Sequence, residues 1–122
     1  MPRVVKAASG LSSDQKLAHH GASVVLGSAI RVIQHAGWYN GENSPTKFQG
    51  KYTLMGAIRF ASKQEGTVDV LAQSWVLNVL RNDLKPPFKN MGDYNTAPGR
   101  TQEDVIKVLE MAMKKIDQHL GY

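Results

Sequence analysis

Cysteine is absent from this chain of 122 residues. Without a thiol there can be no disulfide, no thiolate nucleophile and no cysteine-ligated metal. Long apolar runs are missing as well, since no stretch approaches the roughly 18–20 residues that a membrane-spanning helix needs. The basic start, Met1 to Lys6, is not followed by the apolar core of a secretory signal. We therefore expect one cytoplasmic domain that makes no membrane contact.

Acidic residues are the minority charge. The chain has 15 Lys and Arg against 10 Asp and Glu, a net charge of +5 at pH 7, and a pI near 9.6. This moderate excess permits an acidic partner or nucleic acid, although many small proteins carry it for solubility alone. Aromatic residues make up only 7% of the chain, yet several lie in two glycine- and proline-containing stretches, 38–51 and 85–100. Disordered segments are poor in aromatic residues, so both stretches are expected to be ordered loops.

Apolar residues recur at helical spacing in the first half of the chain. Ser12 and Gln15 have the spacing of a capping box, and Gly37 is a natural stop, so a first helix is expected between them. A second, shorter helix is expected from Tyr52 to Gln64, because its apolar residues share one face. The segment before the first cap, residues 1–11, lacks periodicity and is expected to be a flexible arm.

Two further helices are expected in the second half. Thr67 can cap a third, which Pro86-Pro87 must end. The last begins after Thr101 and carries a clear apolar stripe from Val105 to Leu120. The sequence therefore predicts an all-α fold over residues 12–122: a single-domain bundle of about four helices with two long ordered loops.

The segment from Asn95 to Ile106 is the most densely specified part of the chain. Pro98-Gly99 is a strong turn signal, and Thr101 is a good N-cap with Glu103 and Asp104 in the first helical turn. These features explain how the last helix starts. They do not explain Arg100, which makes this residue a candidate for function.

Three segments together resemble a small family of uncharacterised actinobacterial and actinophage domains. They are Arg31 to Gly41 with Gly-Trp, Leu54-Met55-Gly56-Ala57-Ile58, and Asn95 to Ile106. The family pattern is similar to "VI…GW..G", then "LLGA(L/I)", then "WND.PGRT..EV". Here Tyr94-Asn95-Thr96 stands in place of Trp-Asn-Asp, which removes the acid of that motif. The resemblance implies a helical fold, a bacterial or phage origin and packing of the three motifs together; it assigns no chemistry.

Trp38, Asn95 and Arg100 each admit two interpretations. Trp38 and Arg100 can line a cleft for an anion or a base, as an aromatic ring and a guanidinium often do. Alternatively Trp38 fills the core beneath the loops, and Arg100 bonds the carbonyls that end a neighbouring helix. For Asn95, the side chain is expected to close an Asx turn, with ligand contact as the alternative.

Basic side chains can form one patch if the two loops meet. Interleaved aromatic residues would make that patch typical of a nucleic-acid surface; ordinary solubilising charge is the alternative. Its basic members are Lys47, Lys51, Arg59, Lys85, Lys89 and Arg100, and its aromatic members are Trp38, Phe48, Phe88 and Tyr94. The candidate contacts to a partner or ligand are Trp38, Asn40, Lys47, Lys51, Arg59, Lys89, Tyr94, Asn95 and Arg100.

Apolar residues also lie off the main stripes of the last two helices: Val76, Val79, Val108 and Met111. They indicate either a partner or self-association surface or a broad face turned to the core. No histidine pair has the spacing of a metal site, and no serine or carboxylate has a recognisable catalytic partner. We therefore expect no metal, no cofactor and no catalytic residue.

The best hypothesis from sequence is a small non-enzymatic helical binding module. Its partner is expected to be a macromolecule, most readily a protein, with self-association into a homo-oligomer left open. The first alternative is a nucleic-acid-binding protein that uses the basic, aromatic-containing loops. The weaker alternative is an enzyme with its pocket between those loops.

Overall fold

The computed structural model describes residues 11–121. Its helices and strands are α2 (Ser13–Ala36), β1 (Lys47–Phe48), β2 (Lys51–Tyr52), α3 (Leu54–Glu65), α4 (Val70–Asn82), α5 (Met91–Thr96) and α6 (Gln102–Leu120). The expectation of a mainly helical fold is confirmed, with five helices and one small antiparallel hairpin in this range. The expected flexible arm lies outside the described residues except for Leu11, which packs against the core.

The first helix begins and ends where its signals predicted. The Ser12 hydroxyl accepts a hydrogen bond from the Gln15 backbone N–H at 3.1 Å, and Gln15 Oε1 accepts from the Ser12 N–H at 2.9 Å. This capping box satisfies N–H groups that have no partner within the helix. Gly37, at φ +97°, turns the chain away after Ala36. Such a conformation favours glycine, so local sequence signals set both ends of α2.

The cap predicted for the third helix is wrong. Gly66 adopts a left-handed conformation with φ +68° and ends α3, and the next N–H, that of Thr67, donates to the Ser62 carbonyl at 3.1 Å. These bonds form a Schellman motif, which uses Thr67 to finish α3. Consequently α4 starts at Val70, after Asp69, and it ends at Asn82 before the two prolines.

Each expected loop contains a short regular element. In the first loop β1 and β2 pair antiparallel, Lys47 with Tyr52 and Phe48 with Lys51, so Tyr52 belongs to a strand and Thr53 caps α3. In the second loop Asn90 caps α5 by accepting from the Asp93 N–H at 2.8 Å. Elements of two and six residues are too short to show periodicity, which is why the sequence does not reveal them.

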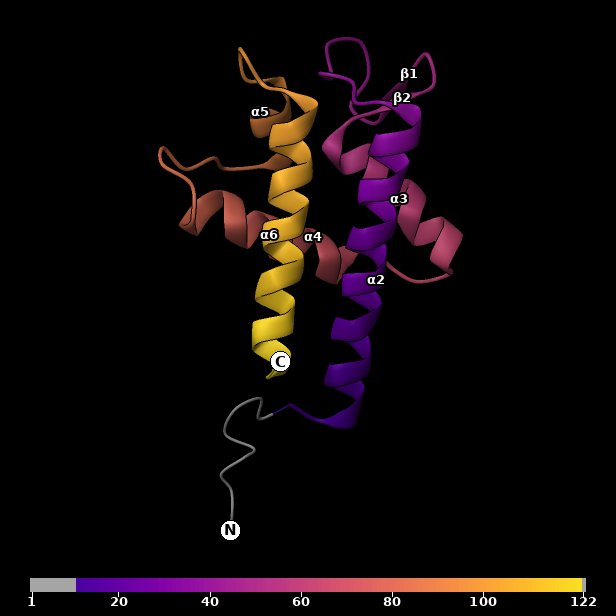
Figure 1. Ribbon diagram of the computed structural model, residues 1–122, viewed down its shortest axis with the longest axis vertical. Coiled ribbons are helices and arrows are strands. Elements are labelled where there is room, and N and C mark those ends of the chain that lie inside the picture. The colour runs from indigo at the N-terminus through magenta and orange to yellow at the C-terminus, as the bar shows by residue number, and fades with distance from the viewer. Residues whose placement is uncertain (1–10, 122) are drawn as a thin grey trace.

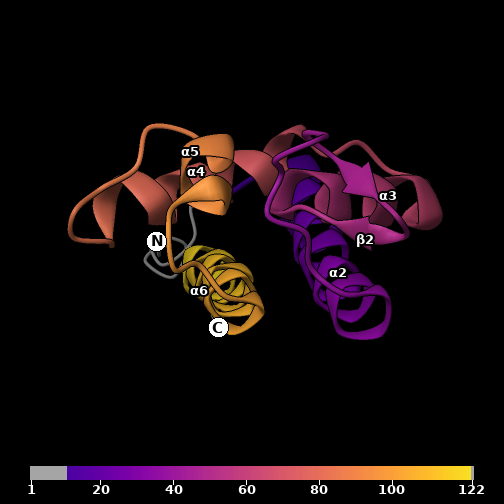
Figure 2. The same cartoon turned by 90° about the horizontal axis from the view of Figure 1, so that it is seen from above.

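The helices form two layers. In Figure 1, α2 and α6 lie side by side in front, and α4 and α3 cross behind them. Figure 2, seen from above, shows α3, α4 and α5 as the second layer, with the hairpin beside α3. The core lies where α2 meets α6, α3 and α4. The hairpin, α5 and the start of α6 gather at one end of the molecule (Figure 1).

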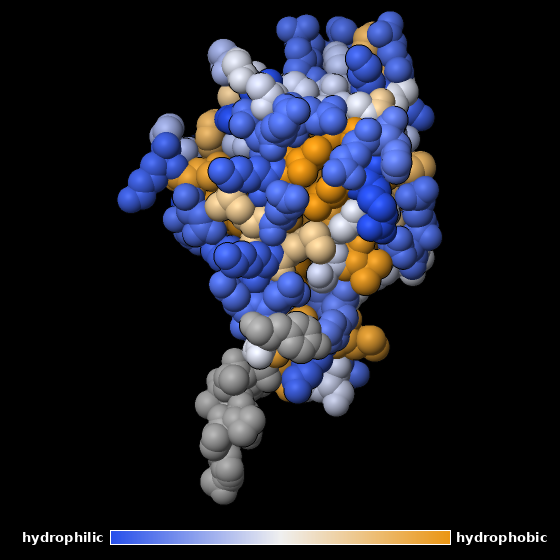
Figure 3. Space-filling view, in the orientation of Figure 1, coloured by the Kyte–Doolittle hydropathy of each residue, from blue (hydrophilic) through white to orange (hydrophobic). Residues whose placement is uncertain are grey.

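The apolar residues outside the main stripes face this core. Val76, Val79 and Val108 are buried, and Met111 packs against the core while partly exposed. The interpretation of Val76, Val79 and Val108 as a partner surface is therefore wrong, because a small two-layer fold buries a broad face of each helix. For Met111, which also lines a hollow, it stays a prediction. On the face drawn in Figure 3, apolar side chains show mainly along the seam between α2 and α6, within a largely hydrophilic surface.

Candidate functional site

Asn95 joins three segments that are distant in sequence. Its Oδ1 accepts from the Trp38 indole Nε1–H at 2.6 Å and from the Leu54 backbone N–H at 3.0 Å. Its Nδ2 donates to the Tyr39 carbonyl at 2.9 Å. We call Trp38, Tyr39, Leu54 and Asn95 the Asn95 junction. The buried side chain of Asn95 uses three of its four hydrogen-bonding positions to bond these partners. It does not close the expected Asx turn.

The residues around the junction are bonded to it or packed closely against it. The Trp38 backbone N–H donates to Gln102 Oε1 at 3.1 Å, which ties this loop to the first turn of α6. Gly41 has φ +92°, and a Cβ built there would lie 3.1 Å from Thr96 Cγ2 and 3.3 Å from Asn95 Nδ2. Its conformation therefore favours glycine, and its surroundings are tight for any side chain. The predicted packing of the three motifs is confirmed by these contacts.

Gly56 allows the hairpin to dock on α3. A Cβ at this position would lie 1.8 Å from the backbone oxygen of Thr46. The same oxygen accepts from the Thr53 N–H at 3.0 Å, and the Thr53 hydroxyl donates to the Pro45 carbonyl at 2.6 Å. The loop before β1 thus packs backbone against backbone on the first turn of α3. This contact explains the glycine of the Leu-Met-Gly-Ala motif.

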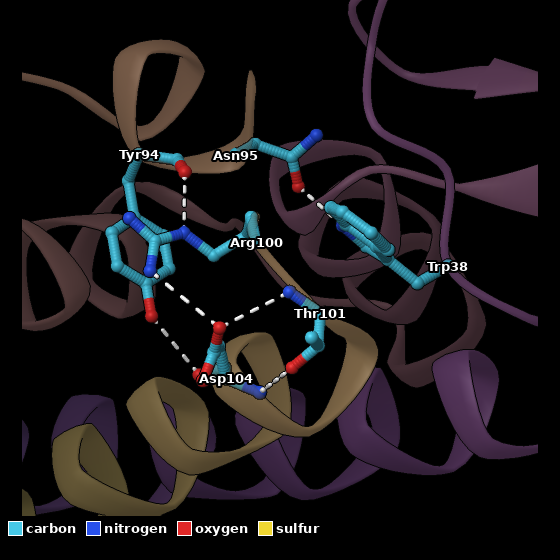
Figure 4. A network of polar contacts seen from close by, with 6 residues as sticks. All are labelled: Trp38, Tyr94, Asn95, Arg100, Thr101 and Asp104. Atoms are coloured by element: carbon cyan, nitrogen blue, oxygen red, sulfur yellow. Dashed lines mark hydrogen bonds and ion pairs between the residues drawn. The ribbon is translucent and has the colours of Figure 1, made fainter. Parts of the chain in front are cut away.

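Arg100 is held by groups of its own chain. Its Nε–H donates to the Tyr94 carbonyl in the last turn of α5 at 2.8 Å, and its guanidinium carbon lies 3.6 Å from the centre of the Tyr94 ring. Nη1 lies 3.6 Å from Asp104 Oδ2, and only 16% of the Arg100 side chain is exposed. Figure 4 shows this stack beside the bond between Asn95 and Trp38. The structural alternative for Trp38 and Arg100 predicts this kind of arrangement; a ligand role for either stays a prediction.

Tyr94 completes the stack as a neutral phenol. Burial raises its pKa, the nearby Arg100 guanidinium lowers it in part, and Asp104 raises it. The hydroxyl therefore keeps its proton at neutral pH and donates to the Asp104 carbonyl at 3.1 Å. Phe88 packs edge-on against the same ring, with 5.2 Å between ring centres.

A small hollow lies beside the junction. It has a volume of about 280 Å³, and Gly41, Thr53, Met91, Asp93 and Asn95 are among its lining residues. Among the described residues 11–121, Asp93 is the sole titratable side chain that lines it. Catalysis by proton transfer needs an acid or base within reach of the substrate and normally a second group to complete the chemistry. This hollow offers one carboxylate for that purpose.

Four of the six basic residues expected in one patch fall into two groups. Lys47 and Arg59 line a hollow beside the hairpin and α3, whereas Lys85 and Arg100 line another, of about 410 Å³, with Lys107 of α6. Figure 2 shows the hairpin and α3 on one side of the molecule and α5 and α6 on the other. The loops do meet, but at the Asn95 junction rather than through their cations.

The remaining candidates lie on separate stretches of the surface. Lys51 is exposed, and its side chain runs over Gly37, where an added Cβ would lie 3.3 Å from Lys51 Cγ. Lys89 is exposed, and its carbonyl accepts from Arg81 Nε–H at 3.0 Å. Asn40 Oδ1 accepts from the Glu42 N–H at 3.0 Å, as in an Asx turn.

Sequence reasoning named Lys47 and Arg59 but missed the other members of a basic and aromatic surface beside the hairpin. Two adjacent hollows, of about 530 and 340 Å³, share Lys47, Tyr52 and Phe60. Over the described residues 11–121, neither hollow is lined by Asp or Glu. We define the hairpin surface as Arg31, His35, Lys47, Tyr52, Arg59, Phe60 and Lys63. Arg31 with His35, and Arg59 with Lys63, are four residues apart on their helices, a spacing that was available as a signal.

An aromatic pair forms the centre of the hairpin surface. The rings of Tyr52 and Phe60 lie 5.1 Å apart between centres and are tilted by 36°. Lys47 Nζ lies 5.5 Å from the centre of the Tyr52 ring. Phe60 is 38% exposed, whereas Tyr52 is buried behind it. Arg59 is 58% exposed and forms a loose ion pair with Asp69 at 3.9 Å. Such an exposed pair contributes little to stability.

A second cluster lies between α2, α4 and α6. The rings of His19 and His119 are 4.8 Å apart between centres, and Trp75 lies 5.9 and 5.1 Å from them. The sequence could not bring these residues together, because they meet only when the helices pack. Within the described part of the chain, no three His, Cys, Asp or Glu side chains are grouped as metal ligands would be. In the same part, no helix is both long and apolar enough to cross a membrane.

A match to a known protein family covers the segments described above. Neither the curated proteins nor the solved structures include a match to the chain. One family model, described as a family of unknown function (DUF6197), matches residues 18–115. This range contains all three motifs and every residue of the Asn95 junction and the hairpin surface. On that match, the chain belongs to the family of unknown function DUF6197.

Proposed function

We propose that this protein is a small non-enzymatic binding module that holds an anionic macromolecule on its hairpin surface. The observation that carries the proposal is the lining of the two adjacent hollows: exposed cations around an aromatic pair, with no carboxylate among the lining residues of the described chain. A cluster of one sign raises the local concentration of an oppositely charged partner and speeds its association. The resemblance to actinobacterial and phage domains makes host or phage macromolecules the first partners to test.

The arrangement of the Asn95 junction supports a binding role over a catalytic one. The polar atoms of Asn95 bond to Trp38, Tyr39 and Leu54. In the part of the chain that the structure describes, the adjoining hollow has Asp93 as its sole titratable lining residue. Catalytic groups instead sit in clefts with partners that shift their pKa values. An assembled pair of this kind is missing from the described hollow.

The test is a comparison of two charge-reversal variants. Lys47→Glu with Arg59→Glu changes the hairpin surface, and Lys85→Glu with Lys107→Glu is the matched control, because all four side chains are exposed and both variants have the same net charge. We expect retention on immobilised polyanions at low salt to fall sharply for the hairpin variant and only slightly for the control. Circular dichroism checks that both remain folded. Equal losses would mean that net charge alone drives retention and would refute the proposal.

A further inference from the structure

The hairpin surface has a ridge with a basic hollow on each side. Lys47, Tyr52 and Phe60 line both hollows and therefore stand between them. The hollow toward α2 adds Arg31 and His35, one helical turn apart, about 5.4 Å along the axis. The hollow toward α3 adds Arg59 and Lys63 at the same spacing. Arg31 with His35 on one side, and Arg59 with Lys63 on the other, thus flank one aromatic pair.

We propose that this ridge binds single-stranded nucleic acid, with one base stacked on Phe60 and the flanking phosphates in the two hollows. The inference rests on the proposed function and names the class of its partner. A positively charged groove combined with an exposed ring is the general means by which proteins hold single strands without reading sequence. The ring of Phe60 is 38% exposed, and the Tyr52 ring packs against it at 5.1 Å. Because its position is fixed before binding, stacking on it requires little ordering.

The exposed ring distinguishes a single strand from other anions. An acidic peptide can pair with Lys47, Arg59 and the other cations, but its carboxylates do not stack on an aromatic face. In duplex DNA the base faces are stacked inside the helix, and extracting one costs unstacking energy. A single strand presents both phosphates and free base faces, which matches both features of the ridge.

Fluorescence anisotropy with a labelled single strand of about 12 nucleotides tests the proposal, since known site sizes fall near this length. We expect Phe60→Ala and Phe60→Leu to weaken binding by roughly tenfold or more, as loss of a base–aromatic stack does elsewhere. Phe60→Tyr keeps the ring and should bind like the parent protein. Because Phe60 is partly exposed, the variants should fold, and thermal melting verifies this.

Salt dependence tests the phosphate contacts separately. Lys47→Gln should lower the slope of log affinity against log salt by about 0.7, the value for one phosphate of a single strand. Lys85→Gln, on the other side of the molecule, should leave the slope unchanged. Equal effects of Lys47→Gln and Lys85→Gln would overturn the proposal, because binding would then follow net charge.

Two further probes separate this inference from the proposed function. If poly-glutamate binds as tightly as the single strand and Phe60→Leu changes neither, the nucleic-acid inference is wrong and the proposed anionic-partner function stands. A duplex that binds more tightly than the single strand also overturns the inference. If neither polyanion binds the full chain at low salt, both proposals fail.

Discussion

The Asn95 junction and the hairpin surface use their polar groups in opposite ways, although α5 and the hairpin lie at the same end of the molecule (Figure 1). At the junction, Asn95 is 3% exposed and its side chain bonds to two other segments of the chain, at Trp38-Tyr39 and at Leu54. On the hairpin surface, the side chains of Arg31, Lys47 and Lys63 are exposed around a partly exposed Phe60. The first region holds the fold together, and the second presents charge to solvent.

This difference explains why the most recognisable residues of the motifs hold the fold together, although Arg31 and His35 of the first segment belong to the hairpin surface. Gly56 is required because a Cβ would collide with the Thr46 backbone, and Gly41 is favoured by its positive φ. Asn95 bonds to backbone groups of Leu54 and Tyr39 as well as to the Trp38 indole. Such demands fix the residue type tightly. A surface that collects charge needs cations near one another, and many sequences satisfy that need. Dense local specification here is thus a sign of packing.

The strongest test of the comparison is Gly56→Ala. Alanine normally stabilises a helix relative to glycine by up to about 1 kcal/mol, but here its Cβ would lie 1.8 Å from the Thr46 backbone oxygen. The loop or the helix must shift, so we expect the free energy of unfolding to fall by about 3 kcal/mol. Urea denaturation measures it. Gly21→Ala in α2 is the control, since its nearest contact is 3.9 Å away, and it should be neutral or stabilising. A Gly56→Ala protein as stable as the parent would contradict the docking of the hairpin on α3.

The next largest effect is expected for Asn95→Ala. Removal of the amide leaves the Leu54 N–H and the Tyr39 carbonyl without their partner, which should cost about 2–3 kcal/mol of unfolding free energy. The Trp38 indole N–H should also exchange faster with solvent, because its acceptor is gone. Proton NMR in D₂O follows this exchange, and the indole of Trp75 serves as an internal control. Unchanged exchange at Trp38 would show that the junction does not form in solution.

The sequence predicts the long elements well because their signals are local. α2 has a capping box at one end and a glycine at the other, and α6 has Thr101 with Asp104 in the same arrangement. These residues act within one or two turns, so neighbours in sequence suffice. The prediction that Thr67 caps the next helix was wrong because Thr67 follows the left-handed Gly66, and its N–H bonds to the end of α3. From sequence, Thr67 was compatible both with ending one helix and with starting the next.

The sites depend on tertiary packing and could be predicted only in part. Packing of the three motifs followed from their co-occurrence, yet the role of Asn95 as their shared partner did not, because an asparagine before a turn more simply suggests an Asx turn. The ridge of the hairpin surface combines the hairpin with α3, and Arg31 comes from α2. Since β1 and β2 have two residues each, no alternation of apolar and polar residues predicted the hairpin that brings Lys47 to these helices.

The smallest effect on stability is expected for Arg100→Lys. Compared with Lys47→Gln, it should separate stability from polyanion binding most clearly. Lysine keeps the charge of Arg100 but loses the planar fork that donates to the Tyr94 carbonyl and stacks on its ring, so we expect a loss of about 1 kcal/mol in unfolding free energy. Polyanion binding should be unchanged. Lys47→Gln should weaken polyanion binding and leave the free energy of unfolding nearly unchanged. Its side chain is exposed, and surface substitutions usually alter stability by less than about 0.5 kcal/mol. Urea denaturation and polyanion anisotropy on the same samples give both readings. If Arg100→Lys weakens binding without changing stability, Arg100 contacts the partner, and the binding surface includes the start of α6.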